Sequence, residues 1–228
     1  MLPVILQFQN VRCAAGPMHD RGLEAAAFAL DAGDLLLMRV GAGQRRTPVA
    51  DVAQGVLAPE AGTVAFLDED WQGVLPDRAA ALRGRIGRVF GTGGWLSNLD
   101  VDENITLAQR YHTDRAEEEI LEEARQLGQA FGFEELPAAR PHTLERDVLR
   151  RAQWVRAFLG QPRLLLFEHP TQELDGHWVE PLVARMQAAR QGGAAVVWIT
   201  ADPVEWNFSG MNATLKFEWK DTKMVAVT

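Results

Sequence analysis

The feature that most constrains the fold is an unbroken apolar run over residues 164–167, which ends in the acid Glu168. A short run without polar alternation is typical of a parallel strand that is buried on both faces of a sheet. A second such run covers residues 194–200. It follows a helical pattern that can be capped by Asp175 and stops at Gly192. Strand, helix and strand in this order predict an α/β protein with a mostly parallel sheet.

The N-terminal part of the chain predicts strands and one short helix. Apolar and polar residues alternate over residues 4–8, and two further strand candidates cover residues 23–30 and 35–40. A helix is expected from Thr47, as N-cap, to about Gln54, because Pro at the next position tolerates the missing N–H of a first helical turn. A turn and a further strand follow over residues 58–67.

The middle of the chain predicts a helical part inserted into the α/β core, over about residues 106–155. Asp114 is expected to cap a helix whose apolar residues recur up to Phe131, and a second helix is expected over residues 145–159. The alternation over residues 213–227 predicts a C-terminal β-hairpin. We therefore expect one domain over residues 1–228, with no internal repeat or flexible linker.

Composition narrows the possible functions. The 228 residues carry a formal net charge of −8, which argues against nucleic-acid binding. Cys13 is the single cysteine, which fits a reducing compartment. The start of the chain has no basic segment of the kind that opens a signal peptide, and no apolar run approaches the roughly 20 residues of a membrane-spanning helix. We expect a cytoplasmic protein without direct membrane insertion.

Three motifs occur in a recognisable order and spacing. They are APEAGTV (58–64), RIGRVFGTGGWLSNLDVDENI (85–105) and RAFLGQPRLLLFEHPTQELD (156–175). Together they resemble the nucleotide-binding domain of ABC transporters, over roughly residues 2–202. The resemblance implies a P-loop NTPase-like cassette: a mostly parallel sheet core, an antiparallel N-terminal β portion and a helical subdomain.

The phosphate-binding loop of that family departs from its pattern here. A phosphate loop needs glycines, whose backbone N–H groups close around the phosphate, and a lysine. In VGAGQRRTP (40–48), Val40 and Arg45 stand at the glycine positions and Arg46 at the lysine position, and Pro48 removes one N–H. The remaining candidates for a weak phosphate contact are Gly41, Gly43, Arg46 and Thr47.

The other positions with catalytic roles in the family also differ. Gly91 stands where the family has the Q-loop glutamine, and Ala201 stands where it has the switch histidine. Glu168 replaces the magnesium-binding aspartate and, with Thr47, is the candidate metal ligand. His169 replaces the glutamate that polarises water. No aromatic residue lies between Val11 and Gly22 to stack on adenine. No catalytic residue of the family is intact.

The signature motif of the family, LSGGQ, is matched by Leu144, Glu145, Arg146, Asp147 and Val148. In the family this segment contacts the γ-phosphate of ATP held by the opposite subunit. Two carboxylates at a helix N-terminus are good caps, but they would repel a polyanion. The segment therefore predicts weak or absent MgATP binding, and no cofactor is expected.

The interpretation that follows is a pseudo-ATPase: a non-catalytic cassette subunit that docks on the coupling helix of a membrane permease. It would be peripheral, on the cytoplasmic face of the inner membrane, and would pair with a second cassette subunit as a homodimer or with a competent partner. The candidates for the permease contact are Trp95, Leu96, Leu99 and Val101, whose alternative role is core packing.

Two other functions stay open. One is a divergent but active ATPase that uses Arg46, Thr47, Glu168 and His169. The other is a regulatory or scaffold protein that reuses the fold without a permease. Within the first interpretation, the segment from Arg88 onward resembles cassettes of bacterial MCE-type lipid-transport permeases. Fold and family do not fix a substrate. Trp206 and Trp219 are interpreted as core residues, with a protein interface as the alternative.

Overall fold

The computed structural model describes residues 2–43 and 46–227 and contains two sheets. The first is antiparallel, with strand order β2-β1-β4-β5. The rings of Phe8 and Phe28 stack across the β1–β2 pair, with centroids 4.5 Å apart. The strands of this sheet are β1 (Val4–Cys13), β2 (Leu23–Asp31), β4 (Ala61–Phe66) and β5 (Glu69–Asp70).

The second sheet has the order β10-β9-β3-β8-β7-β6 and is parallel except for the β9–β10 hairpin. The hairpin lies beside β2, where the Glu24 amide donates to the Thr222 carbonyl. The strands of this sheet are β3 (Leu35–Arg39), β6 (Ile86–Val89), β7 (Leu164–Glu168), β8 (Ala195–Thr200), β9 (Leu215–Lys220) and β10 (Lys223–Ala226).

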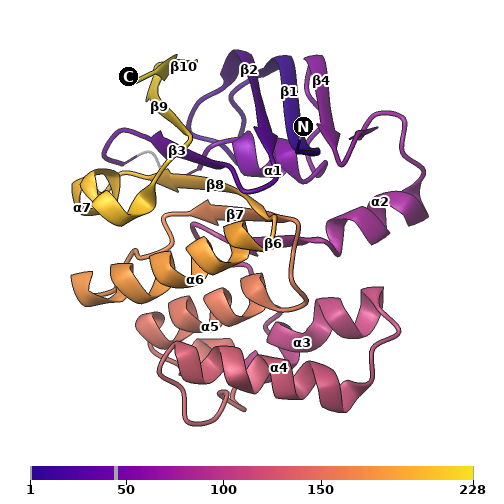
Figure 1. Cartoon of the computed structure of the whole chain (residues 1–228), viewed down its shortest axis with the longest axis vertical. Helices are drawn as coiled ribbons and strands as arrows, with labels where there is room; N and C mark the ends of the chain where they lie inside the picture. The colour runs from indigo at the N-terminus through magenta and orange to yellow at the C-terminus, as the bar shows by residue number, and fades with distance from the viewer. Residues whose placement is uncertain (1, 44–45, 228) are drawn as a thin grey trace.

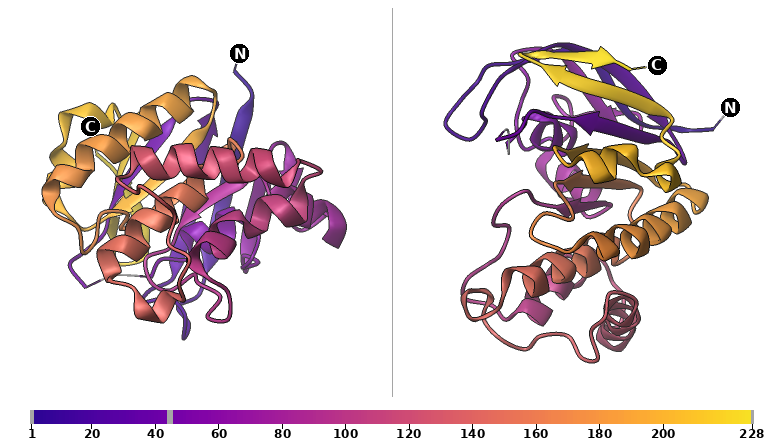
Figure 2. Two further views of the ribbon diagram at one scale, coloured as in Figure 1. Left: turned by 90° about the horizontal axis from the view of Figure 1, so that it is seen from below. Right: turned by 90° about the vertical axis from the view of Figure 1, so that its left-hand side faces the viewer.

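Both faces of the parallel sheet are covered, as the apolar runs predict. Alternate residues of β7 point to opposite sides: Leu164 and Leu166 pack toward the antiparallel sheet, and Leu165 and Phe167 pack toward the helices. The antiparallel sheet, the parallel sheet and the helices follow one another as layers in Figures 1 and 2. Every residue of β7 is buried, which confirms this strand as predicted.

Helices α3, α4, α5 and α6 form the lower part of the molecule in Figure 1. Gly87 lets β6 lie directly against α5, because a Cβ at this position would be 1.8 Å from the Ala157 carbonyl oxygen. The helices are α1 (Val49–Ala53), α2 (Pro76–Arg83), α3 (Val101–His112), α4 (Glu117–Ala130), α5 (Arg146–Phe158), α6 (Val179–Gln191) and α7 (Pro203–Asn207), with 3₁₀ turns at Pro141–Thr143, Gly176–Trp178 and Ser209–Met211. None of the described helices is long and apolar enough to cross a membrane.

Two predicted helix caps are wrong. Helix α1 begins one residue later than expected, with Pro48 at the N-cap in helical conformation, and the buried Thr47 does not cap it. Helix α4 begins after Ala116 rather than after Asp114, with acidic residues in its first turn that suit the helix dipole. Asp175 precedes a 3₁₀ turn that leads into α6 and makes no side-chain cap bond. Trp206 and Trp219 are buried, as interpreted.

Candidate functional site

The acid that ends β7 is bound by an arginine of the neighbouring strand β6. Glu168 Oε2 accepts hydrogen bonds from Arg88 Nε at 3.0 Å and from Arg88 Nη2 at 2.8 Å. Both side chains are only 8% exposed. The two strands are parallel neighbours, and this register brings the two side chains to the same edge of the sheet. The carboxylate that the resemblance assigns to magnesium therefore has a guanidinium as its counter-ion.

The same guanidinium also reaches the helix that follows the phosphate loop. Arg88 Nη1 donates to Asp51 Oδ1 at 2.6 Å and to Gln54 Oε1 at 3.0 Å, and both acceptors lie on or next to α1. The other Asp51 oxygen, Oδ2, lies 2.8 Å from His19 Nε2, in the β1–β2 connection. We call Arg88, Glu168, Asp51 and His19 the internal ion network. It joins the parallel sheet and the β1–β2 connection to α1.

Burial and charge act in opposite directions on the two acids. Burial raises the pKa of Asp51, but the positive charge of Arg88 and the hydrogen bonds from His19 and Arg88 outweigh it, so this pKa is below its usual value. For Glu168, burial is the larger effect, and its pKa is raised despite Arg88. The network therefore holds an ionised Asp51 and a Glu168 whose charge depends on Arg88.

The phosphate-loop segment lies beside this network. The described residues Gly41, Gly43 and Arg46 are exposed, and Gly43 has a φ of +91° that favours glycine. The Arg46 amide donates to Asp20 Oδ2 at 3.0 Å, which fixes the end of the loop to the β1–β2 connection. Arg45, expected at a glycine position, lies outside the described residues.

A cavity of about 310 Å³ lies between this loop and the carboxyl ends of β7 and β8. His169 is buried with a φ of +48°, a left-handed backbone that is uncommon outside glycine. Ala201 lines the cavity with a side chain that cannot donate a hydrogen bond. Glu205, which the sequence analysis did not single out, also lines the cavity. It accepts hydrogen bonds from Thr171 Oγ1 and from Trp198 Nε1, and its pKa is raised by burial.

The Q-loop position and the signature-like segment lie on the other side of β7. Arg150 of α5 donates to the carbonyl oxygens of Phe90 at 2.6 Å and Gly91 at 3.3 Å, so the loop backbone, rather than a glutamine side chain, is held here. Glu145 is the N-cap of α5 without a side-chain cap bond. The signature-like residues Leu144, Glu145, Arg146, Asp147 and Val148 thus form the start of α5, as their resemblance implies.

The permease-contact candidates divide by burial. Leu96 is 50% exposed, Trp95 and Leu99 are half-buried, and Val101 is 0% exposed, so Val101 has no surface to offer a partner. Leu96 lines a groove of about 470 Å³ with the exposed Leu107 and Tyr111 of α3. Arg156 forms another wall, with its guanidinium 4.6 Å from the Trp95 ring centroid.

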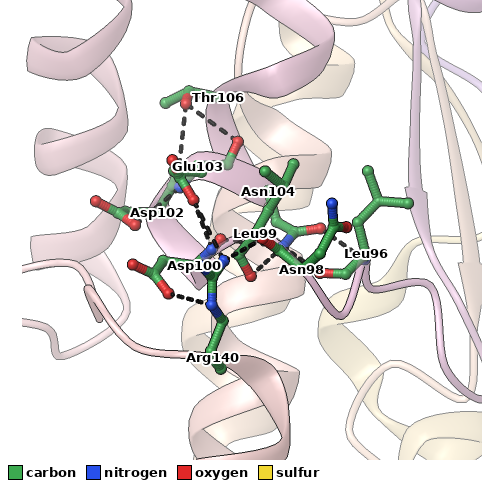
Figure 3. Close-up of polar contacts among 9 residues, drawn as sticks. All are labelled: Leu96, Asn98, Leu99, Asp100, Asp102, Glu103, Asn104, Thr106 and Arg140. Carbon is green, nitrogen blue, oxygen red and sulfur yellow. Dashed lines mark hydrogen bonds and ion pairs between the residues drawn. The ribbon is translucent and has the colours of Figure 1, made fainter.

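One side chain fixes the loop that carries these candidates (Figure 3). Asn104 Oδ1 accepts from the Leu96 amide at 2.9 Å, and Asn104 Nδ2 donates to the carbonyl oxygens of Leu96, Leu99 and Asp100. Asp100 and Glu103 form a capping box at the start of α3. Arg140 pairs with both of these acids and also donates to the Asn98 carbonyl. The exposed Leu96 is therefore held on a rigid loop.

The chain is similar in sequence to ATP-binding subunits of bacterial transport systems. No protein-family model matches the chain. The chain is 29% identical over 180 residues, 78% of each chain, to the lipoprotein-releasing system ATP-binding protein LolD of Gluconobacter oxydans. It is 27% identical over 196 residues to the cytochrome c biogenesis ATP-binding export protein CcmA of Pseudomonas putida, covering 86% of this chain and 90% of the relative.

A solved structure agrees with the sequence relatives. The ATP-binding cassette MJ0796, in a dimeric post-hydrolysis state bound to ADP and Pi, superposes with a TM-score of 0.82 at 20% identity and covers 96% of both chains. These similarities confirm the resemblance to ATP-binding cassette domains. They also confirm the fold: a P-loop NTPase-like core with parallel strands, an antiparallel N-terminal sheet and a helical subdomain.

The residues of this chain do not fit MgATP, the cofactor that the fold implies. Glu168 is already engaged by Arg88, and Arg88 is held in turn by Asp51. One feature favours MgATP binding: the buried Oγ1 of Thr47 has no hydrogen-bond partner among the described residues. A second cation beside Glu168 would have to displace a guanidinium that makes bonds to three side chains.

The sequence analysis identified Glu168 but not its partners in the internal ion network. Arg88 lies in a short strand between Gly87 and Val89, and an arginine in such a strand is seldom buried without a paired acid. This rule could have indicated an acidic partner for Arg88, because Glu168 ends the strand that pairs with the strand of Arg88. Asp51 and His19 gave no comparable signal, since His19 lies in a connection between strands and no motif places it against α1.

Proposed function

We propose that the chain is a cassette subunit that does not hydrolyse ATP and that acts by docking on a membrane permease. The observation that carries the proposal is the bond between Arg88 and Glu168 at 2.8 Å. It gives the acid at the magnesium position a counter-ion within the chain. Hydrolysis in this fold needs that acid free for a metal, and His169 and Ala201 replace two further groups that would act on ATP.

The internal ion network also holds the elements around the phosphate loop together. It links β6, β7, α1 and the β1–β2 connection through charged hydrogen bonds. A cassette in which these elements are held together by its own side chains does not depend on a ligand for the arrangement of its core.

The docking surface that we propose is the groove that contains Leu96, Leu107 and Tyr111. Its apolar side chains are exposed, and the Asn104 bonds hold their loop in place, which suits an apolar helix lying in a groove. The ring of Trp95 lies under the guanidinium of Arg156, which lines this groove. We propose a peripheral position on the cytoplasmic face of the inner membrane.

A second cassette subunit is part of the proposal, because one similar solved structure is a dimer. In such a pair the acids Glu145 and Asp147 would lie at the start of α5, facing the other subunit's phosphate loop. Their charge disfavours a bound polyphosphate there. The cargo is a separate matter: the relatives are named for lipoprotein release and for cytochrome c biogenesis, and we keep an MCE-type lipid permease as the proposed partner class.

A site-specific cross-link tests the docking surface. Cys13 is buried and its pKa is raised by burial, so a Leu96→Cys variant carries one accessible thiol. A thiol-reactive photo-cross-linker at this position, in membranes from the source cells, is expected to yield an adduct with an integral membrane protein. Val204→Cys, which is also exposed but lies on α7, is the matched control. Equal adducts from both positions, or none, would favour the scaffold function instead.

The divergent ATPase is the second candidate, and Thr47 favours it. Its buried hydroxyl lies at the magnesium-facing position of the phosphate loop, and the curated relatives are named as ATP-binding proteins. Phosphate release from MgATP is the test. Turnover by the wild type that disappears in His169→Ala would establish this candidate and overturn the pseudo-ATPase proposal.

A further inference from the structure

A second cavity with a polar lining lies at the opposite end of the parallel strands from Glu168. It is a cavity of about 620 Å³ between α4, α5 and α6, and a smaller one of about 470 Å³ adjoins it. Four arginines line the two cavities, and we call this surface the arginine hollow: Arg85, Arg115, Arg163 and Arg185. Arg85 and Arg163 directly precede β6 and β7, so the hollow lies at the amino ends of these strands.

The charge of the arginine hollow is opposite to that of the whole chain. The sequence carries a formal net charge of −8, yet one acid, Glu123, lines the two cavities with the four arginines. Both carboxylate oxygens of Glu123 already have partners. Its Oε2 pairs with Arg115 Nη1 at 2.7 Å, and its Oε1 accepts the Gly160 amide at 3.1 Å. No ion pair to Arg163 or Arg185 is found within residues 2–43 and 46–227.

Two guanidinium nitrogens of the hollow lack hydrogen-bond partners. The Nε atoms of Arg163 and Arg185 are both buried, and neither donates to any residue in the described part of the chain. The two side chains are only partly buried. A buried N–H without an acceptor is nevertheless uncommon in native proteins, and a bound anion would supply the missing acceptor. The Arg185 guanidinium lies over the Phe158 ring, 5.6 Å from its centroid, which holds it in position without neutralising it.

We propose that the arginine hollow binds a phosphate-bearing anion. The planar fork of several N–H donors on each guanidinium matches the oxygens of a phosphate group better than a single point charge does. Arg163 and Arg185 would provide the main contacts, and the exposed Arg85 would extend the site toward solvent. The ligand is either a free phosphate compound or the phosphate headgroup of a membrane lipid. The site is separate from the phosphate loop.

Calorimetric titration of pyrophosphate into the full chain tests the site. We expect saturable binding by the wild type and about tenfold weaker binding for each of Arg163→Gln and Arg185→Gln, as for loss of one charge-assisted bond. Arg125→Gln, on an exposed arginine of α4 that pairs with Glu122, is the matched control and should bind as the wild type does. Arg46→Gln tests the phosphate loop separately: binding that is lost in this variant but kept in Arg163→Gln and Arg185→Gln would place the anion at that loop and overturn the proposal.

Sedimentation with vesicles distinguishes the two sources of phosphate. Vesicles of phosphatidylcholine with phosphatidic acid are compared with phosphatidylcholine alone. Binding to the acidic vesicles that is lost in Arg163→Gln/Arg185→Gln assigns a lipid headgroup, whereas pyrophosphate binding without vesicle binding assigns a free compound. If the double variant does not fold, the exposed Arg85→Gln is used in its place, with a smaller expected loss. Absence of both kinds of binding in the wild type, or equal binding by the variants, would overturn the proposal.

Discussion

The internal ion network predicts a large and specific loss of stability when Arg88 is removed. Arg88→Met keeps an apolar stem of similar length but leaves Glu168, which is 8% exposed, without its counter-ion. Removal of one partner from a buried ion pair costs about 3–5 kcal/mol. For a domain of this size, each kcal/mol lowers Tm by about 2–4 °C. The expected fall in Tm is therefore about 10 °C, measured by circular dichroism with urea unfolding as a second assay.

The fall in Tm of Arg88→Met should depend on pH and on the presence of Glu168. Burial raises the pKa of Glu168, so in the variant its carboxyl can take up a proton at low pH, and the loss should be smaller at pH 5 than at pH 8. Glu168→Leu in the Arg88→Met background should recover most of the stability, because the uncompensated acid is gone. Arg78→Met, which removes an exposed pair with Glu69, is the control and should leave Tm unchanged. Equal stability of the Arg88 and Arg78 variants would refute the reasoning.

Three further predictions concern the rest of the chain. Glu205→Gln should raise stability more at pH 8 than at pH 5: the pKa of Glu205 is raised, so the stability that it contributes is present at low pH and is lost as pH rises through the folded pKa. Thermal unfolding across this range checks it, and a pH-independent effect would contradict it. Gly87→Ala should cost about 3 kcal/mol or more by urea unfolding, because its Cβ would meet the Ala157 carbonyl; Gly16→Ala, in open space, should not. Asn104→Ala should cost about 1–3 kcal/mol, through the unpaired Leu96 and Leu99 backbone groups, and should speed amide exchange at Leu96; unchanged exchange would count against the role given to Asn104.

The elements of the fold could be predicted because their signals are local. The apolar run before Glu168 and the run over residues 194–200 are β7 and β8, and the alternation near the C-terminus is the β9–β10 hairpin. Caps were less predictable, because Thr47 and Asp114 are good capping residues whose position relative to the first helical turn depends on tertiary packing. Helix α2, with Pro76 in its first turn, was not predicted although that signal was present.

The candidate site could be predicted in some of its residues but not in its contacts. The motif order identified Glu168, His169 and Ala201, and His169 and Ala201 line one cavity at the carboxyl ends of neighbouring strands. The partner of Glu168 depends on the parallel register of β6 and β7, and the pairing of Asp51 with His19 depends on how the β1–β2 connection folds over α1. Val101, named as a surface candidate, is buried because it begins α3 on the face that packs against the core.

Titration calorimetry of MgATP into the full chain tests the central claim most directly, with ADP and adenosine as controls. Because Glu168 is engaged by Arg88, we expect no binding heat and no rise in Tm at millimolar MgATP. Micromolar binding that raises Tm and is absent with adenosine would contradict it. Such a result would mean that the cassette opens the bond between Arg88 and Glu168 to admit a metal and a nucleotide.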